Sequence, residues 1–472
     1  MPKKTYQDLV ASLLPGSEVD EFMACCNARL PKTIKILTHK ISSPETKKYI
    51  SNRHREFQEP NVKSGTNNRD DIFYVTSEKS LGQHFFHQWG FMYIQELAAS
   101  LPAQVLDPKP GDLVLDICAA PGWKAVQLSD TLLSYANQNP GLVIANEPNP
   151  TRRKALIFNL NRTGVYNTAL LGYDGTRLGN ILPETFDKIL LDAPCSGEWM
   201  AYKTNKTQNI RNERWAQNLA SLQYQLLVSA IHACKVWWTI VYSTCTINPL
   251  ENEWVISHAL KTFAGKIELQ PVNLSQTSSG ITEREASSLL DQNDANNVAR
   301  CWPHRQHTGW FFVAKIKKIW STTAQKKEII SPKTGFQYDQ KFQESIKTLL
   351  QESFGIIVPE QYFFVKTEHQ IYVTSPEIVK ILDKIYLEKI GIPIYTLWHH
   401  DQQIPTHHLW NIFGHLASKD VITITDQQAQ DYADGKDLKL TAPHDGFFLL
   451  TWQNHGYSTT KISSGIAKNK ML

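Results

Sequence analysis

The stretch Leu113–Lys124, LVLDICAAPGWK, decides the fold of this chain. It opens with five residues that are apolar except for Asp116, which predicts a short strand buried on both faces. Pro121 and Gly122 then make a tight turn, and a helix is predicted over Trp123–Tyr135. A buried strand that turns directly into a helix is typical of an open parallel α/β sheet, where ligands bind beyond the carboxyl ends of the strands.

The same alternation of strand and helix continues to about residue 318. Further strands are predicted at Leu142–Ala145, just before Asp174, at Phe186–Leu191 and at Trp237–Tyr242. Thr151–Thr163 is predicted to be a helix that buries Ala155, Phe158 and Leu160. Strands and helices that alternate with short connections predict a mostly parallel sheet covered by helices on both faces.

The rest of the chain is less regular. Residues 1–105 are mixed, polar and rich in aromatic side chains, and the polar segment Ser275–Asn297 is predicted to be a surface loop. A domain boundary is expected within Lys317–Lys333, because charged residues there mix with Ser, Thr and Pro. Short β-leaning runs follow, such as Tyr362–Val365 and Phe447–Leu450, and they predict a small β-rich module.

Composition excludes several classes of protein. The 472 residues are 42% hydrophobic and 20% charged, as expected for a globular chain of two to four domains. Seven cysteines without any CxxC pair argue against a zinc site or a disulfide framework. No signal peptide or membrane span is recognisable, and the net charge of +4 permits a nucleic acid partner without requiring one. We expect a cytoplasmic monomer without metal.

Acidic residues stand at the ends of four successive predicted strands: Asp116, Glu147, Asp174 and Asp192. An acid after the second strand suits the two hydroxyls of a ribose, and the acid after the third can reach an adenine amino group. The turn lacks both GxGxxG and the Walker lysine pattern, which argues against a dinucleotide or a triphosphate. S-adenosylmethionine, which has a ribose and an adenine but no phosphate, fits these residues better.

Two cysteines follow the last two strands. Cys195 lies in the sequence DAPCSG and Cys245 in YSTCT. A thiolate that adds to C6 of a cytosine makes C5 nucleophilic enough to accept a methyl group, and a base must then remove the C5 proton so that the thiolate can leave. Asp192 is the candidate that eases the addition at N3. The other cysteines are interpreted as small buried hydrophobic or structural residues, namely Cys25, Cys26, Cys118, Cys234 and Cys301.

These motifs together resemble the Nop2/Sun family of RNA cytosine-5 methyltransferases over roughly residues 20 to 318. The segments that carry the resemblance are Asp192–Glu198, Val241–Pro249 with Glu251–Glu253, Cys118–Gly122 with Lys124, Gly90–Glu96, and Arg300 with Pro303–His304 and Gly309–Lys315. The tail is similar to the PUA-type end of the RsmF branch, whose members modify bacterial small-subunit (16S) ribosomal RNA. Its matching segments are Asp434–Leu438, Gly446–Leu450 and Gly465–Asn469.

The resemblance implies a class I (Rossmann-like) methyltransferase core at 106–318. It also implies an N-terminal α+β RNA-binding domain at 1–105, an accessory domain at 333–390 and a β-rich, PUA-like RNA-binding domain at 391–472. Cys245 would be the nucleophile, and Cys195 would assist breakdown of the covalent adduct, with Asp192 beside them. Cofactor contacts carry over to Cys118, Ala119, Ala120, Pro121, Gly122, Trp123, Lys124, Glu147, Asp174 and Asp192.

The chain departs from the family pattern near both pockets. Trp123 and Ala125 replace Ser and Thr around the lysine, Trp199 replaces a Gly, and Lys235–Trp238 replaces a Pro-Gly-Gly turn. Such bulky residues could narrow the cofactor or target pocket. Basic residues are expected to hold the RNA backbone. The candidates are Arg29, Lys32, Lys35, Lys203, Lys206, Arg300 and His304.

Other interpretations stay open from the sequence. The same chemistry could act on transfer RNA, and a non-catalytic ribosome-assembly factor would result if the tryptophans blocked the cofactor. A C-terminal cluster could also hold a metal, although His-rich tracts without Cys or acids are weak signals. Its members are Trp398, His399, His400, His407, His408 and Trp410.

Overall fold

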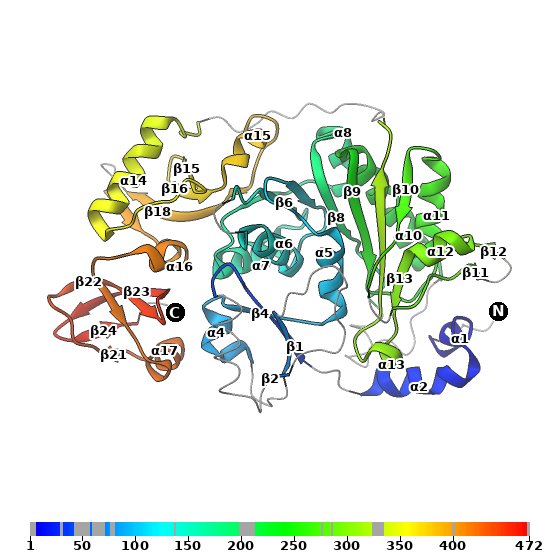
Figure 1. Cartoon of the computed structure of the whole chain (residues 1–472), viewed down its shortest axis with the longest axis horizontal. Coiled ribbons are helices and arrows are strands. Elements are labelled where there is room, and N and C mark those ends of the chain that lie inside the picture. The colour runs from blue at the N-terminus through cyan, green and yellow to red at the C-terminus, as the bar shows by residue number, and fades with distance from the viewer. Residues whose placement is uncertain are drawn as a thin grey trace.

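The computed structural model describes residues 6–28, 32–41, 57–58, 71–75, 81–135, 138–197, 213–274, 277–284, 287–322, 335–398 and 402–469. A nine-stranded sheet forms the centre of the molecule (Figure 1). Its strands are β5 (Leu113–Asp116), β6 (Leu142–Asn146), β7 (Thr168–Leu171), β8 (Phe186–Asp192), β9 (Cys234–Thr244), β10 (Ile267–Gln270), β13 (Val298–Cys301), β14 (Phe311–Lys318) and β17 (Lys389–Ile390).

The strand order is β10-β14-β9-β8-β5-β6-β7-β17, and β13 pairs with β14. Strands β7, β6, β5, β8 and β9 pair in parallel, whereas β14 runs antiparallel to β9. This confirms the predicted Rossmann-like α/β core with its mostly parallel sheet. In such a sheet the carboxyl ends of the parallel strands all reach the same edge, which is where the site is built.

Side chains alternate between two apolar layers along each central strand. In β5, Leu113 and Leu115 pack with α8 (Leu178–Ile181), α10 (Glu213–Ala233) and α11 (Glu253–Thr262). Val114 packs on the opposite face with α5 (Leu101–Leu106), α6 (Trp123–Leu133) and α7 (Pro150–Thr163). A strand covered on both sides must be apolar at nearly every position, as the sequence indicated.

One prediction about α7 was wrong. Leu156 and Leu160 face the core, while Ala155 and Phe158 are exposed. Asn149 caps the helix by accepting hydrogen bonds from the next turn, and this sets its register. Positions four residues apart lie on one face of a helix, so Leu160 shares a face with Leu156 and not with Phe158.

The segment predicted as a surface loop, Ser275–Asn297, also has regular structure. It contains the short strands β11 (Glu283–Arg284) and β12 (Ser287–Ser288) and the helix α12 (Gln292–Asn297). Asp291 caps α12 by accepting a hydrogen bond from the Asp294 amide. Polar capping residues therefore start a helix here, in a segment whose composition indicated only a loop.

The N-terminal region combines two helices with a small sheet. The helices are α1 (Tyr6–Ala11) and α2 (Gly16–Asn27). The sheet has the order β2-β3-β1-β4, with β1 (Lys32–Ile36), β2 (Phe57–Gln58), β3 (Ile72–Val75) and β4 (Met92–Gln95). The short helix α4 (Phe85–Gln88) precedes β4.

Two further sheets follow the central one. The first contains β15 (Phe363–Lys366), β16 (Gln370–Thr374), β18 (Ile392–Trp398) and β19 (Gln402–Pro405), and packs with α14 (Gln340–Phe354) and α16 (His407–Phe413). The second contains β20 (Val421–Thr423), β21 (Leu438–Lys439), β22 (Gly446–Trp452), β23 (His455–Ser463) and β24 (Ile466–Lys468), with α17 (Asp426–Ala433). Because β16 pairs with β18, the first of these sheets continues past the boundary expected at 390.

The last sheet packs against the N-terminal region, at the left of Figure 1. The rings of Trp89 and Tyr457 stack with centroids 3.4 Å apart, and Trp452 contacts both Phe85 and Phe86.

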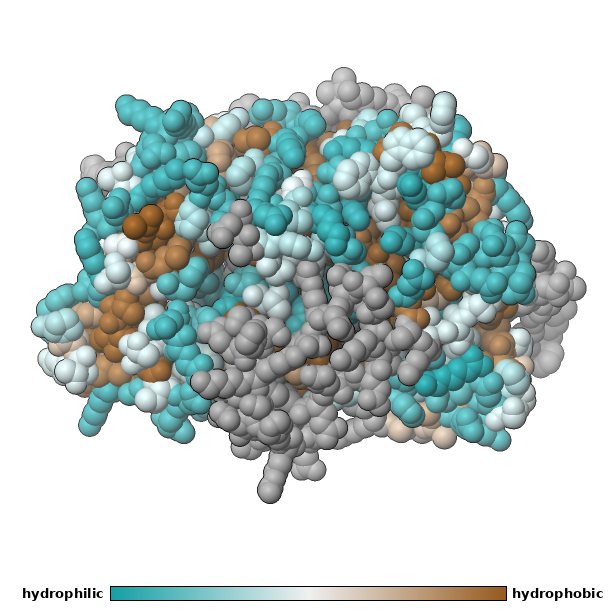
Figure 2. All heavy atoms as spheres, in the orientation of Figure 1, coloured by the Kyte–Doolittle hydropathy of each residue, from teal (hydrophilic) through white to brown (hydrophobic). Residues whose placement is uncertain are grey.

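In the face seen in Figure 2, hydrophilic side chains predominate over the described surface. No helix among the described ranges is long and apolar enough to cross a membrane.

Prediction: Trp89→Ala lowers the free energy of unfolding by ~3–5 kcal/mol, because it leaves a cavity between the first and last parts of the chain. Urea denaturation followed by far-ultraviolet circular dichroism measures the change. Trp398→Ala is the matched control, since that ring is 63% exposed and its loss should cost within about 0.5 kcal/mol. Equal effects of the two substitutions would contradict the packing role of Trp89.

Candidate active site

The carboxyl ends of β5 to β9 bring the predicted acids and cysteines to one edge of the sheet. Asp116 and Asp192 are the last residues of β5 and β8. Glu147 follows β6, and Asp174 lies three residues beyond β7. Parallel pairing therefore gathers on one edge residues that are up to 129 positions apart in the sequence, from Asp116 to Cys245.

Asp116 is completely buried at this edge. Neither of its carboxylate oxygens has a hydrogen-bond partner of good geometry in the described ranges. Burial raises the pKa of Asp116 to about 7, although the nearby Lys124 ammonium lowers it. An acid that is buried at such a cost without partners is typical of a site whose polar groups are arranged for a ligand.

Backbone groups of the loop after β5 form hydrogen bonds to β6 and α7. The Ala119 amide donates to the Asn146 carbonyl at 2.9 Å, and Arg152 donates to the Ala120 carbonyl at 2.9 Å. Gly122 has a φ of +113°, and a Cβ there would lie 2.8 Å from Leu156 Cδ1. A glycine is therefore required for the loop to turn into α6 this close to α7.

The sulfur of Cys118 is unsuited to nucleophilic chemistry. Burial raises the pKa of its thiol well above the usual range, and the charges of Asp116, Asp192 and Glu147 raise it further. A thiol that stays protonated is a poor nucleophile. The structural role predicted for Cys118 fits this environment.

Glu147 and Asp174 differ in their burial and in their hydrogen-bond partners. Glu147 is buried; one of its oxygens accepts from the Asn149 amide at 2.9 Å and the other pairs with Arg152 at 3.1 Å. Asp174 is exposed, and its carboxylate accepts from the Thr176 amide and hydroxyl at 3.0 and 2.8 Å. Both keep acceptor capacity, because each carboxylate oxygen has two lone pairs.

Lys124 connects the loop after β5 to Asp192 at the end of β8. Its ammonium pairs with Asp192 Oδ2, while Ser243 donates to Asp192 Oδ1 at 2.8 Å. The same ammonium lies 3.4 Å from the centroid of the Trp123 ring, a cation–π contact. Trp123 thus covers one side of the lysine.

The two predicted cysteines meet. Cys195 Sγ lies 2.9 Å from Cys245 Sγ, and both cysteines are free thiols. Their approach follows from the pairing of β8 with β9, in which Asp192 is opposite Ser243. The hydrogen bond to Cys245 and burial together raise the pKa of Cys195 well above its usual range. The protonated form of the Cys195 thiol is therefore favoured in this contact.

Two sets of buried polar side chains support the cysteine loops; sequence analysis assigned Glu251 and Gln223 no individual role, and it assigned Arg300 to RNA binding. Glu251 Oε2 accepts from the Ser196 amide and from Gln223, each at 2.9 Å. Gln223 lies on α10 and had no distinguishing signal in the sequence. Arg300 pairs with both oxygens of Glu253 at 2.6 Å. Both groups brace the turn that follows Cys245.

Comparison with known proteins finds relatives among ribosomal RNA methyltransferases. A family model described as 16S rRNA methyltransferase RsmB/F matches residues 103–317. Ribosomal RNA small subunit methyltransferase F of Vibrio parahaemolyticus serotype O3:K6 is 27% identical over 441 residues, which cover 92% of this chain and 88% of that protein. The protein of that name from Vibrio cholerae serotype O1 (strain M66-2) is 29% identical, with 91% and 88% covered.

Solved structures agree as well. A methyltransferase homolog protein from Pyrococcus horikoshii is 31% identical, with a TM-score of 0.55, and the match covers 65% of this chain and 92% of that one. The chain belongs to the RsmB/F family. This confirms the family resemblance and the predicted methyltransferase class. NSun6 from Pyrococcus horikoshii, solved with SFG, shares the fold at 21% identity and a TM-score of 0.52.

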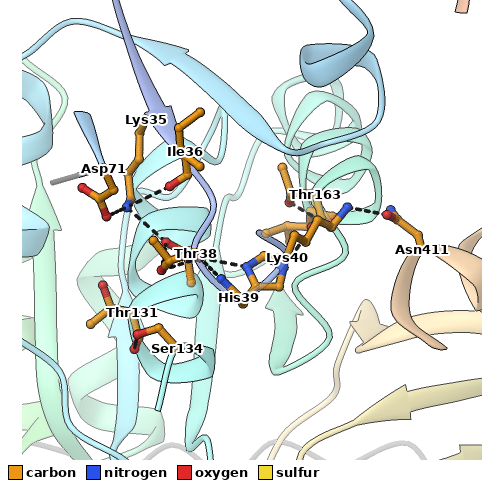
Figure 3. A network of polar contacts seen from close by, with 12 residues as sticks. Lys35, Ile36, Thr38, His39, Lys40, Asp71, Thr131, Ser134, Thr163 and Asn411 are labelled. Carbon is orange, nitrogen blue, oxygen red and sulfur yellow. Dashed lines mark hydrogen bonds and ion pairs between the residues drawn. The ribbon is translucent and has the colours of Figure 1, made fainter. Parts of the chain in front are cut away.

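Two of the basic residues expected to bind RNA are buried in this RsmB/F chain, so that prediction was wrong for them. The Lys35 ammonium lies 2.5 Å from the Asp71 carboxylate (Figure 3). It also lies 3.1 Å from the Asp130 carboxylate. Arg300 is enclosed with Glu253. A buried cation paired with carboxylates has no donor free for phosphate, and separating it would leave uncompensated charge.

The remaining expected RNA contacts differ in their position. His304 is held by Glu18 at 2.7 Å, whereas Lys32 is exposed. Arg29, Lys203 and Lys206 lie outside the described residues, as do Trp199, His399 and His400.

In the described part of the C-terminal histidine cluster, the His407 ring packs on Trp89 with centroids 5.6 Å apart. No group of three metal-ligating residues occurs in the described ranges.

Prediction: the stability of the cofactor-free protein falls, relative to Asp116→Asn, as the pH rises from about 4 to about 7. In this window the folded protein keeps a proton on Asp116 that the unfolded chain has released, so rising pH favours unfolding. The relative loss should reach up to about 4 kcal/mol. Urea unfolding of both proteins across this range measures it. A difference that does not change with pH would mean that Asp116 ionises normally.

Proposed function

We propose that this chain transfers a methyl group from S-adenosylmethionine to C5 of a cytosine in 16S ribosomal RNA, through a covalent bond between Cys245 and C6. The observation that carries the proposal is the 2.9 Å contact between the sulfurs of Cys195 and Cys245, beside the edge where the four acids gather. Two thiols in contact at the ends of adjacent strands suit a reaction that needs one sulfur as nucleophile and a second group nearby.

The residues at the sheet edge fit the cofactor. Asp116 brings buried carboxylate oxygens that have no hydrogen-bond partner of good geometry among the described residues, and Glu147 and Asp174 bring acceptors for ribose hydroxyls and an adenine amino group. We assign cofactor binding to the loop Cys118–Lys124 together with Glu147, Asp174 and Asp192. When bound, S-adenosylmethionine supplies the methyl group, carried on a sulfonium that an electron-rich carbon can attack.

Cys245 acts first in the proposed sequence. Its thiolate adds to C6 of the cytosine, and the electrons of the C5–C6 bond become available at C5. After C5 has gained the methyl group, a base removes the C5 proton and the C–S bond breaks, which returns the thiolate. Cys195, whose pKa is raised, stays protonated beside the departing sulfur and assists this breakdown. Asp192 lies next to both motifs and is assigned to the ring at N3.

The substrate assignment rests on the relatives. The proteins named ribosomal RNA small subunit methyltransferase F align with this chain over 91–92% of its length, which includes the regions before and after the catalytic core. We assign those regions to RNA binding, and the last sheet to a PUA-like domain. The enzyme would act in the cytoplasm, as a monomer, on a base that is unpaired or extruded.

Prediction: Cys245→Ala abolishes methylation, whereas Cys195→Ala lets a covalent protein–RNA species accumulate, because the adduct forms but breaks down slowly. Denaturing gel electrophoresis after incubation with S-adenosylmethionine and 16S rRNA measures both effects. Cys234→Ala is the matched control, since Cys234 is a buried thiol at the opposite end of β9 from Cys245. If the covalent species required Cys195 and survived loss of Cys245, the two roles would be reversed.

Prediction: bisulfite sequencing finds one 16S rRNA cytosine that is methylated in wild-type cells and unmethylated in cells lacking the gene. Complementation with the wild-type gene should restore the mark, and complementation with Cys245→Ala should not. Loss of a mark from transfer RNA instead would favour that substrate. If calorimetry detected no binding of S-adenosylmethionine, the non-catalytic assembly factor would be favoured.

A further inference from the structure

We infer that Trp310 is a positioning residue for Cys245, and that helices α1 and α2 hold Trp310 in place. The inference rests on the function proposed above. Trp310 follows the sharp turn before β14, and its indole N–H donates to the Cys245 carbonyl at 2.8 Å. Trp310 is 1% exposed, so water cannot replace this hydrogen bond if it is lost.

The loop that carries Trp310 is also held by the segment that follows β4. Glu96 lies just after β4, and its carboxylate accepts from the Thr308 hydroxyl and from the Gly309 amide. The Thr308 hydroxyl also accepts from the Ala98 amide at 2.9 Å. Because the two residues before Trp310 are tied in this way, the indole reaches the Cys245 carbonyl from a fixed position.

The other side of the indole is covered by the N-terminal helices. Phe22 on α2 stacks on Trp310 with centroids 5.6 Å apart, and Tyr6 on α1 lies at 5.8 Å. These rings belong to an apolar cluster that also includes Ile247, two residues after the nucleophile. Glu18 on α2 fastens the helix to His304 at 2.7 Å and to Arg305 at 2.6 Å. The N-terminal helices therefore pack directly behind the catalytic turn.

This arrangement controls where the Cys245 sulfur lies. The residue stands at the point where β9 ends, so its carbonyl is not held by the strand ladder, whose last pair on β9 is Thr244 with Phe312. The Trp310 hydrogen bond takes the place of the next ladder bond. A nucleophile that moves by about 1 Å loses about a hundredfold in rate, because attack depends on the distance and direction of approach.

The test separates the hydrogen bond from the packing of the ring. Trp310→Phe removes the N–H and part of the volume. Site-specific replacement of Trp310 by 3-benzothienylalanine keeps the ring shape and removes only the N–H. Each protein is incubated with S-adenosylmethionine and saturating 16S rRNA containing 5-fluorocytosine, on which the adduct cannot break down, and the rate of covalent trapping is measured.

We expect both replacements to slow trapping about tenfold or more, with the affinity for S-adenosylmethionine unchanged by calorimetry. Trp320→Phe is the matched control: it makes the same substitution beyond the opposite end of β14, on a ring that is 65% exposed, so it should leave the trapping rate unchanged. A wild-type rate for the benzothienyl protein would overturn the inference and leave the proposed function intact. Failure of the wild-type protein to be trapped at Cys245 would overturn the proposed function, and this inference with it.

Discussion

The parallel pairing of β8 with β9 is the constraint on which the site depends. It sets Asp192 opposite Ser243, so the two loops that leave the strands start side by side and their cysteines come into contact. The same pairing lets Ser243 donate to Asp192, whose other oxygen is paired with Lys124 of the loop after β5. One strand pair thus links the two thiols, the acid and the loop after β5, and a slip of one residue would point the side chains of one strand to the wrong face.

The buried charged side chains differ in how completely they are paired. Glu253 and Arg300 are buried and fully engaged with each other, as is Lys35 with Asp71 and Asp130, and such groups hold loops in one arrangement. Asp116 is equally buried, but its oxygens have no hydrogen-bond partner of good geometry in the part of the chain that the structure describes. The contrast separates residues that maintain the architecture from a residue whose environment suits a bound ligand, since an unpaired buried carboxylate is costly in a protein that binds nothing there.

Regions outside the core pack against the central sheet or against one another. Strand β17 adds to the edge of the central sheet next to β7, and the last sheet packs on the N-terminal region through Trp89 and Tyr457. Helices α1 and α2 lie behind the turn that follows Cys245. The parts before and after the core therefore support its geometry, in addition to the RNA-binding role proposed for them.

The sequence by itself determined the alternating core, the four acids at strand ends and the two cysteine motifs, because buried parallel strands and tight turns leave local patterns of composition. It misplaced Phe158 on α7, and it assigned Lys35 and Arg300 to RNA. Whether a lysine or arginine faces solvent or a buried carboxylate depends on residues far away in the chain. Only the tertiary structure decided the contact between the sulfurs, the partners of Glu251 and the position of Trp310, because each is made by elements that the sequence keeps far apart and the sheet brings together.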